Sequence, residues 1–317
     1  MLTVFKGLLS PMMYMFFFIA AGFVLRRLKV LPENAAQVLS RLESDFIIPA
    51  VIINSFTRYC TVASIRSNAW AMLLCAGLWL VTFVLAFPIS GLIEKGGYFR
   101  NVYRYQLLFP SWGFMGYALV QALFGAESLY YFILFTLPMS ILCYLYGIPL
   151  LTPKKEDAKS PWKNLLSPSI IATLIGAVLG LSGFEQVIPS FLSDVLTALA
   201  GMFSPVAMLL TGLTIGSYSL KEMFTDKRSY KICAFRMLLF PVILLGLAWL
   251  LGADNQTLVF LLFTHAMPLG LFPVIYPPRF GQDARPGASM ALVSCLFCLI
   301  TVPLFYSILL SFLEAAS

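Results

Sequence analysis

The stretch TPKKEDAKSPWKN, Thr152–Asn164, is the longest strongly polar connection in the chain and divides its apolar segments into two equal groups. Each of these segments is close to the ~20 residues that a helix needs to cross the hydrocarbon core of a membrane. We therefore predict an all-α membrane protein with two five-helix halves, residues 1–151 and 165–317, joined by a cytoplasmic linker, residues 152–164. The ten predicted spans are residues 8–25, 36–56, 69–93, 105–123, 128–151, 165–183, 193–217, 231–252, 256–277 and 287–313.

The basic residues fall on alternate loops between the predicted spans. Of the 21 Lys and Arg residues, 17 lie in the odd-numbered loops or at the adjoining span ends, while Lys6, Arg58 and Arg66 lie on the other side and Arg236 lies inside a span. Cytoplasmic loops carry an excess of Lys and Arg, so both termini are predicted to lie outside. The 17 residues are Arg26, Arg27, Lys29, Arg41, Lys95, Arg100, Arg104, Lys154, Lys155, Lys159, Lys163, Lys221, Lys227, Arg228, Lys231, Arg279 and Arg285.

The composition excludes an ordinary soluble domain. The chain is 60% hydrophobic and 11% charged, whereas soluble domains carry about 25% charged residues. A multi-pass protein of the cell membrane (inner or plasma membrane) is expected, with the lipid bilayer as its main partner. The net charge of +7 follows from the basic cytoplasmic loops, so nucleic acid is not expected as a partner.

The motifs of enzymes and metal sites are missing from the sequence. There is one histidine, and there is no His/Glu metal motif, P-loop or G-x-S-x-G sequence. The CxxC pair Cys295 and Cys298 lies within an apolar span without a second pair, and helix packing explains it better than metal or redox chemistry. We expect neither catalysis nor a metal or other cofactor.

The fourth predicted span of each half contains residues that interrupt helices. Because each half has an odd number of spans, a second half built like the first would be inverted in the membrane. Inverted repeats with Gly/Pro interruptions at corresponding spans indicate the binding site of a secondary transporter; a packing kink is the alternative for either interruption alone. The interrupting residues are Pro110, Gly113 and Gly116 in the first half and Pro268, Gly270 and Pro273 in the second.

A helix break at mid-membrane is tolerated only where protein or a water-filled cavity satisfies the freed backbone groups. The N-terminal end of the half-helix after such a break carries roughly half a positive charge and favours a carboxylate. We therefore expect a small organic anion as the substrate. The expected substrate-binding residues are Pro110, Ser111, Trp112, Gly113, Gly116, Thr264, His265, Pro268 and Gly270.

Short fragments along nearly the whole chain resemble the auxin efflux carrier family, whose bacterial members are proposed to carry malonate and malate. This resemblance implies two inverted five-helix repeats with helices four and nine broken and crossing at the substrate site, a fold similar to that of the bile acid:sodium symporters. It also implies a scaffold of helices 1, 2, 6 and 7, a transport unit of helices 3–5 and 8–10, and a homodimer through the scaffold helices. The fragments include residues 22–27, 31–33, 48–50, 113–116, 122–125, 167–172, 204–207 and 266–268, together with Arg236 and Pro241.

The sequence departs from the family pattern at the first break. Helix four of the family usually reads Asn-Thr-Gly-Phe-x-Gly-x-Pro, whereas this chain has Ser111 in place of the amide residue and Ala118 in place of the proline. These departures put the usual pose of family substrates in doubt. They leave the implied fold unchanged.

Ionisable side chains within a span are costly and are therefore functional candidates. His265 is a coupling candidate because its ordinary pKa suits proton transfer, and Asp45 is a second one, although its neighbours Arg41 and Glu43 place it at the membrane interface. Supporting polar candidates are Asn54, Ser204, Thr211 and Arg236, and Arg236 could instead snorkel to the cytoplasmic interface.

Taken together, the sequence predicts a secondary active transporter of a small organic anion, such as malate, malonate or an auxin-like weak acid, that works by alternating access. H+ or the membrane potential is the expected driving force. A sodium-coupled symporter on the same fold is the closest alternative, although no acidic cluster in the sequence demands Na+, and a sodium requirement of uptake would distinguish it. A non-transporting membrane sensor is the alternative from another class.

Overall fold

The structure is a computed structural model, and it describes all residues except 1, 154–164, 185–187 and 317. Apart from Thr152 and Pro153, the predicted linker lies outside the described residues. The described part of the chain is built from helices, and its one β pairing is an isolated bridge between two loops. This is the expected architecture for a chain whose backbone groups have to be satisfied within each apolar segment.

Among the described residues, the first half contains five helical stretches and the second half contains eight, several of them continuing through a π-helical turn. The first comprises α1 (Leu2–Arg27), α2 (Ala35–Leu42) continuing through η1 (Glu43–Ile47) into α3 (Ile48–Tyr59), α4 (Val62–Ile93), α5 (Gly97–Leu108), and η2 (Trp112–Gly116) continuing through α6 (Tyr117–Leu142) and η3 (Cys143–Gly147) into α7 (Ile148–Leu151). The second comprises α8 (Pro168–Leu181), α9 (Ser190–Gly216), α10 (Leu220–Thr225), α11 (Lys227–Ala234) continuing through η6 (Phe235–Leu239) into α12 (Phe240–Leu250), α13 (Asn255–Ala266), α14 (Phe272–Ile275), η7 (Pro277–Phe280) and α15 (Arg285–Ala316).

Six helical stretches of the described chain are long and apolar enough to cross a membrane. The stretch Trp112–Leu151 turns at Gly125, whose φ of 83° is not helical, close to the predicted boundary between residues 123 and 128. The count of ten crossings and the outer position of the termini stay predictions. The other five stretches are Leu8–Arg27, Val62–Ile93, Ser190–Gly216, Lys227–Leu250 and Arg285–Ala315.

Three of the helices contain a π-helical turn that ends two residues before a proline. These turns are η1 before Pro49, η3 before Pro149 and η6 before Pro241. Proline has no N–H to donate and its ring clashes with the carbonyl of the residue four positions earlier. A π turn accommodates this clash by inserting one extra residue into the helix, and such turns are frequent at functional sites.

One group of helices, which we call the scaffold bundle, consists of α1, α2–η1–α3, α8 and α9. α1 packs along α9, and α3 packs along α8 and also contacts α9. Glycines bring these backbones close together: a Cβ on Gly212 of α9 would overlap the carbonyl oxygen of Ile19, and one on Gly176 of α8 would lie 2.7 Å from Cβ of Phe56. Small residues at such positions allow the backbone contact that holds helices together in lipid.

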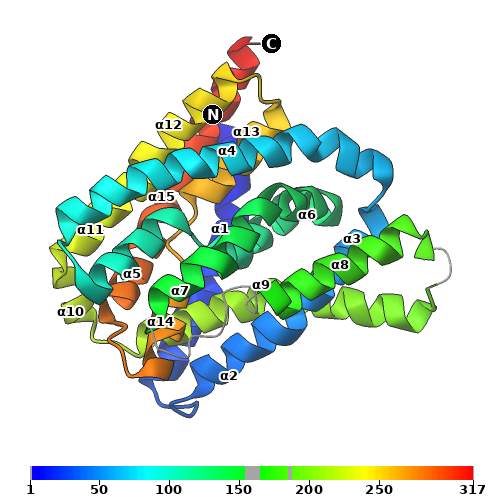
Figure 1. Cartoon of the computed structure of the whole chain (residues 1–317). Coiled ribbons are helices and arrows are strands. Elements are labelled where there is room, and N and C mark those ends of the chain that lie inside the picture. Colours follow the sequence, from blue (N-terminus) through cyan, green and yellow to red (C-terminus); the bar gives the residue numbers. More distant parts are fainter. Residues whose placement is uncertain (1, 154–164, 185–187, 317) are drawn as a thin grey trace.

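The remaining helices form a second group, the crossover bundle, which consists of α4 to α7 with η2 and η3, and of α10 to α15 with η6 and η7. α4 packs against α5 and α6, α12 packs against α13, and α15 packs against α10, α11 and α13. Figure 1 shows α4, α12 and α13 in the upper part of the molecule and α2, α3, α8 and α9 in the lower part. The two groups contain the helices that the resemblance assigns to a scaffold and to a transport unit; they also contact each other, through α3 with α6 and α1 with α15, and the functional division stays a prediction.

Candidate crossover site

The two predicted helix breaks lie against each other in the crossover bundle. The first break separates α5 from η2, the second separates α13 from α14, and Pro110 and Leu269 form an antiparallel bridge between them. The backbone N–H of Ser111 donates to the carbonyl oxygen of Pro268 at 2.8 Å. The crossing is therefore made by main-chain groups that each break has released from its helix.

Two buried side chains hold the second break in place. The Gln106 amide Nε2 donates to the carbonyl oxygen of Gly270 at 3.0 Å, and Oγ of Ser294 accepts a bond from the backbone N–H of Leu269 at 2.9 Å. Gly270 packs so closely that an added Cβ would lie 3.0 Å from the carbonyl oxygen of Phe109. The glycine therefore allows the two breaks to touch.

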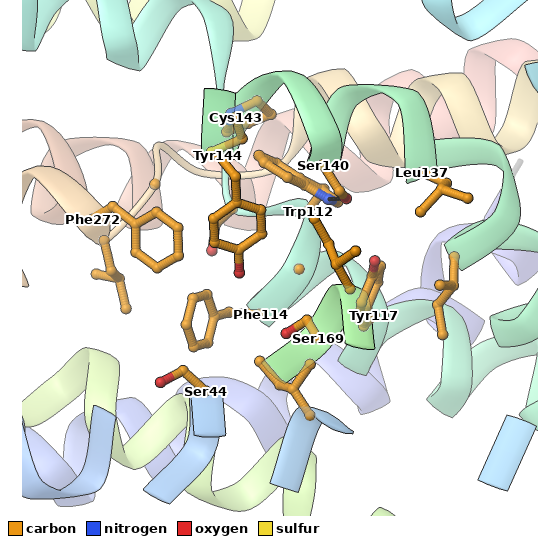
Figure 2. A pocket seen from close by; sticks show the side chains of 18 of the residues that line it. Ser44, Trp112, Phe114, Tyr117, Leu137, Ser140, Cys143, Tyr144, Ser169 and Phe272 are labelled. Carbon is orange, nitrogen blue, oxygen red and sulfur yellow. Dashed lines mark hydrogen bonds between the residues drawn. The ribbon is translucent and has the colours of Figure 1, made fainter. Parts of the chain in front are cut away.

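A cavity opens beside this crossing, between the two bundles (Figure 2). The crossover bundle contributes residues of both breaks and of α6 and η3, while the scaffold bundle contributes side chains of η1, α3 and α8. A ligand here would contact both bundles at once. The lining residues used below are Ser44, Ile48, Tyr105, Pro110, Ser111, Trp112, Gly113, Phe114, Tyr117, Ser140, Tyr144, Ser169, Thr173, Gly270 and Phe272.

Three π-helical turns supply part of the cavity wall. Ser44 comes from η1, Trp112 and Phe114 from η2, and Tyr144 from η3. Figure 2 shows Ser44 on one side of the cavity, facing Phe114 and Tyr144 from the other bundle. The extra residue of a π turn rotates the following side chains, so these turns help decide which side chains face the cavity.

The N-terminal end of the half-helix that begins with η2 faces the cavity. The carbonyl oxygen of Ser111 accepts bonds from the N–H groups of Met115 and Gly116, both at 3.0 Å, so the amides of Trp112, Gly113 and Phe114 form the first turn. First-turn amides have no acceptor within their own helix. Together with the partial positive charge at this end, they form a place for a negatively charged or carbonyl oxygen.

Ser111 adds a hydroxyl at the same end. Its side chain is 4% exposed and lines the cavity, and its Oγ has no hydrogen-bond partner among the described residues. The neighbouring Trp112 is held in place because its Nε1 donates to Oγ of Ser140 at 3.2 Å. A buried polar group without a partner is costly, and a ligand oxygen would satisfy Ser111.

The rest of the cavity is mainly aromatic and aliphatic, with further hydroxyls from Ser44, Ser140, Ser169 and Thr173, and none of its described lining residues carries a charge. Tyr105, Phe114, Tyr117, Tyr144 and Phe272 form much of the wall. Such a site suits a small ligand with an apolar body whose charge is met by helix amides and hydroxyls.

A second cavity adjoins the first and shares Ser44, Tyr144 and Phe272 with it. Arg41, Asp45 and Arg279 line this second cavity, which lies on the side predicted to be cytoplasmic. The path from that side to the crossing therefore passes charged groups before it reaches the uncharged interior.

The expected substrate-binding residues divide into two sets. Pro110, Ser111, Trp112, Gly113 and Gly270 line the cavity beside the crossing.

The other expected residues lie behind the crossing. An added Cβ on Gly116 would lie 3.2 Å from Phe132 and 3.6 Å from Met267, and Pro268 contributes its carbonyl oxygen to Ser111. Thr264 donates to the carbonyl oxygen of Phe260 at 2.8 Å within its own helix. His265 is buried, and its Nδ1 lies 2.6 Å from Nη1 of Arg236.

The coupling and supporting candidates are scattered over the molecule. Asp45 is exposed in the charged cavity and accepts a bond from Ser44 at 2.8 Å. Asn54 is buried and lines a separate hollow with Arg58 and Ser193.

On α9, Ser204 is half-buried and Thr211 donates to the carbonyl oxygen of Ala207 at 2.9 Å. Arg236 is fully buried, so the alternative that its side chain reaches the cytoplasmic interface is wrong in this conformation.

Two features escaped the sequence reasoning. Glu43, expected at the interface, is fully buried, and its carboxylate oxygens have no partner among the described residues. The aromatic cavity wall was also missed, since spans that are apolar on all sides give no periodic signal for an inner face. The prolines that follow η1 and η3 are the sequence signal that could have indicated that Ser44 and Tyr144 lie in π-helical turns facing the cavity.

Comparison with known proteins identifies the class to which this architecture belongs. The model of the family described as "Membrane transport protein" matches residues 8–306, nearly the whole chain. The chain therefore belongs to this family, the auxin efflux carrier family of membrane transporters, as the sequence fragments predicted.

Two relatives carry transporter names. An "Uncharacterized transporter" of Methanothermobacter thermautotrophicus is 21% identical over 313 residues, which cover 96% of this chain and 100% of the relative. The "Uncharacterized transporter YfdV" of Escherichia coli strain K12 is 23% identical over 321 residues, which cover 96% of this chain and 97% of the relative. Family membership and the apolar helices make this chain a multi-pass membrane transporter, and such membership favours a non-enzymatic role.

Proposed function

We propose that the chain is a secondary active transporter of a small organic anion in the cell membrane, either a carboxylate such as malate or malonate or an auxin-like weak acid. The observation that carries this proposal is the position of the cavity, which lies between two bundles and receives the N-terminal end of a half-helix. A ligand bound at that end contacts both bundles, so a change in their relative position changes its access to the two sides of the membrane.

The chemistry of the cavity favours an anion with an apolar body. The amides of Trp112, Gly113 and Phe114 and the hydroxyl of Ser111 are available for an oxyanion, and the aromatic wall surrounds the rest of the ligand. In this proposal the crossover bundle moves against the scaffold bundle, whose glycine-mediated contacts are close and extensive. Protons or the membrane potential drive the transport.

Binding is tested by the thermal stability of the purified protein in the presence of malate, malonate, other carboxylates, amino acids and indole acids. A ligand that binds the folded state raises Tm by mass action. We expect a carboxylate to raise Tm of the wild type and Ser111→Ala to weaken that binding about 2- to 10-fold, the loss of one hydrogen bond. The matched control is Ser217→Ala, because Ser217, the residue directly after α9, donates to the carbonyl oxygen of Leu213 and lies outside the cavity.

Transport is tested by uptake of the same labelled carboxylate into proteoliposomes. Uptake that is saturable and reduced by Ser111→Ala, but unchanged by Ser217→Ala, supports the crossover site. Binding without uptake in either direction would favour the sensor function instead, and the absence of any binding by carboxylates would contradict the proposed substrate class.

A further inference from the structure

Arg236 is the largest fully buried side chain of the described residues and lies in the π-helical turn η6. Its Nη1 lies 2.6 Å from Nδ1 of His265. A guanidinium nitrogen can only donate, so Nδ1 of His265 is the acceptor and the ring is neutral with its proton on Nε2. His265 accepts a hydrogen bond from Arg236 but brings no negative charge.

No acidic group compensates this buried charge within the described residues. Arg236 takes part in neither of the ion pairs found there, and its Nε and Nη2 have no hydrogen-bond partner in the same part of the chain. An arginine keeps its positive charge in proteins, and a buried charge without compensation is strongly destabilising. The guanidinium carbon lies 5.6 Å from the centre of the Phe240 ring, which can stabilise a cation but carries no net charge. A further source of negative potential is therefore needed.

Arg236 reaches the C-terminal turn of the half-helix α13 through its bond with His265. α13 ends at Ala266, directly before the second break, and His265 lies in its last turn. The turn η6 packs against α13. The last carbonyl groups of a helix receive no hydrogen bond from within the helix, and this end carries about half a negative charge, which favours a cation close by.

In carriers with broken helices, half-helix C-terminal ends and unwound carbonyl groups are where coupling cations such as Na+ are bound. We propose that the guanidinium of Arg236 is a built-in cation at this end of α13, and that it makes binding at the crossover independent of Na+. This inference rests on the proposed transport function and assigns its ion requirement. It also explains why Arg236 is buried beside the crossing although it does not line the substrate cavity.

The surroundings favour a fixed charge over a bound metal ion. The nearest side-chain partner, His265, directs its acceptor nitrogen at the guanidinium. A mobile cation would have to displace Arg236 or share the helix end with a second positive charge.

The test measures Tm without any organic substrate, with NaCl, KCl or choline chloride at constant ionic strength. The variants are Arg236→Ala and Arg236→Gln, which remove the charge, and Arg236→Lys, which keeps it. The matched control is Arg104→Ala, because Arg104 is a half-buried arginine of the same bundle that stacks on Phe87 and bonds Ser90 away from α13. For the wild type, Arg236→Lys and Arg104→Ala, we expect that the Tm of each protein does not change between the three salts.

In Arg236→Ala or Arg236→Gln we expect a lower Tm that rises with the logarithm of the Na+ concentration, as binding to the folded state requires. A Na+-specific rise in Tm of the wild type would overturn the proposal, as would neutral variants that keep the wild-type Tm without Na+. Should both neutral variants fail to fold, the wild type and Arg236→Lys still decide it. Because no organic substrate is present, this test is independent of the carboxylate test. A negative result here does not contradict the proposed substrate class, and a lack of carboxylate binding does not contradict the role proposed for Arg236.

Discussion

Pro110 and Leu269 are 159 positions apart in the sequence and form an antiparallel bridge that joins the two helix breaks. Each residue belongs to a segment that has left its helix, and the N–H of Ser111, next to Pro110, donates to the carbonyl oxygen of Pro268, next to Leu269. The substrate cavity lies directly beside this bridge and includes Pro110. The position of the cavity thus follows from the pairing of the two breaks.

Gly270→Ala is expected to push the two breaks apart. The added Cβ would lie 3.0 Å from the carbonyl oxygen of Phe109, which is backbone and cannot move freely. Overpacking of this kind typically costs about 1–3 kcal/mol, so the free energy of unfolding and the uptake rate should both fall. The comparison is Gly113→Ala, where an added Cβ meets nothing within 4 Å, and where Tm should stay close to that of the wild type.

Ser294→Ala is expected to destabilise the second break. The substitution leaves the backbone N–H of Leu269 buried without the acceptor that Ser294 provides. An unsatisfied buried donor costs about 1–3 kcal/mol, which a thermal unfolding measurement in detergent can detect. Thr301→Ala is the control in the same helix, since Thr301 bonds only the carbonyl oxygen of Phe297 one turn earlier; equal losses in both variants would argue against a special role of Ser294.

His265→Gln tests whether this ring couples transport to protons. The amide oxygen of Gln can accept the bond from Arg236 as Nδ1 of His265 does, so the fold should be kept. A proton added to Nδ1 would break that bond and place two positive charges together, which would link protonation to the conformation of the second break. The positive charge of Arg236 beside Nδ1 opposes that protonation, so we expect the uptake rate of His265→Gln to keep the wild-type dependence on pH between about 5 and 8, whereas a lost dependence would support a coupling role. An unchanged pH profile would remove His265 from the coupling mechanism.

Gly212→Val is expected to separate α1 from α9 in the scaffold bundle. A Cβ at this position would overlap the carbonyl oxygen of Ile19, so the helices could no longer keep their contact. The loss of stability should be at the upper end of the range for overpacking, about 3 kcal/mol. Gly201→Val in the same helix is the matched control, because an added Cβ there meets nothing within 4 Å, and its Tm should change little.

The sequence allowed the two breaks to be located because proline and glycine act locally. Pro110 and Pro268 interrupt their helices wherever the rest of the chain lies, and the structure places the breaks at these residues. The same reasoning extends to the π turns before Pro49, Pro149 and Pro241. Features that depend on one residue type and its own backbone can be predicted in this way.

The partners of buried polar residues could not be predicted. Arg236 and His265 are 29 positions apart and meet only because η6 packs against α13. Glu43 looked like an interfacial residue beside Arg41 and Asp45, yet the π turn η1 directs it inward while Asp45 remains exposed. Such facing depends on helix packing and on an extra residue in a turn, and neither is visible in a uniformly apolar span.

The bridge between the breaks has a consequence for how this family can diversify. The contacts of Ser111 with Pro268 and of Pro110 with Leu269 are made by main-chain atoms, so they do not require any particular side chain at position 111. This chain has Ser111 and the fully buried Ala118 where the family usually has an amide residue and a proline, and its crossing is nevertheless complete. Evolution can therefore exchange the side chains that select a ligand while the backbone junction that presents them is inherited unchanged.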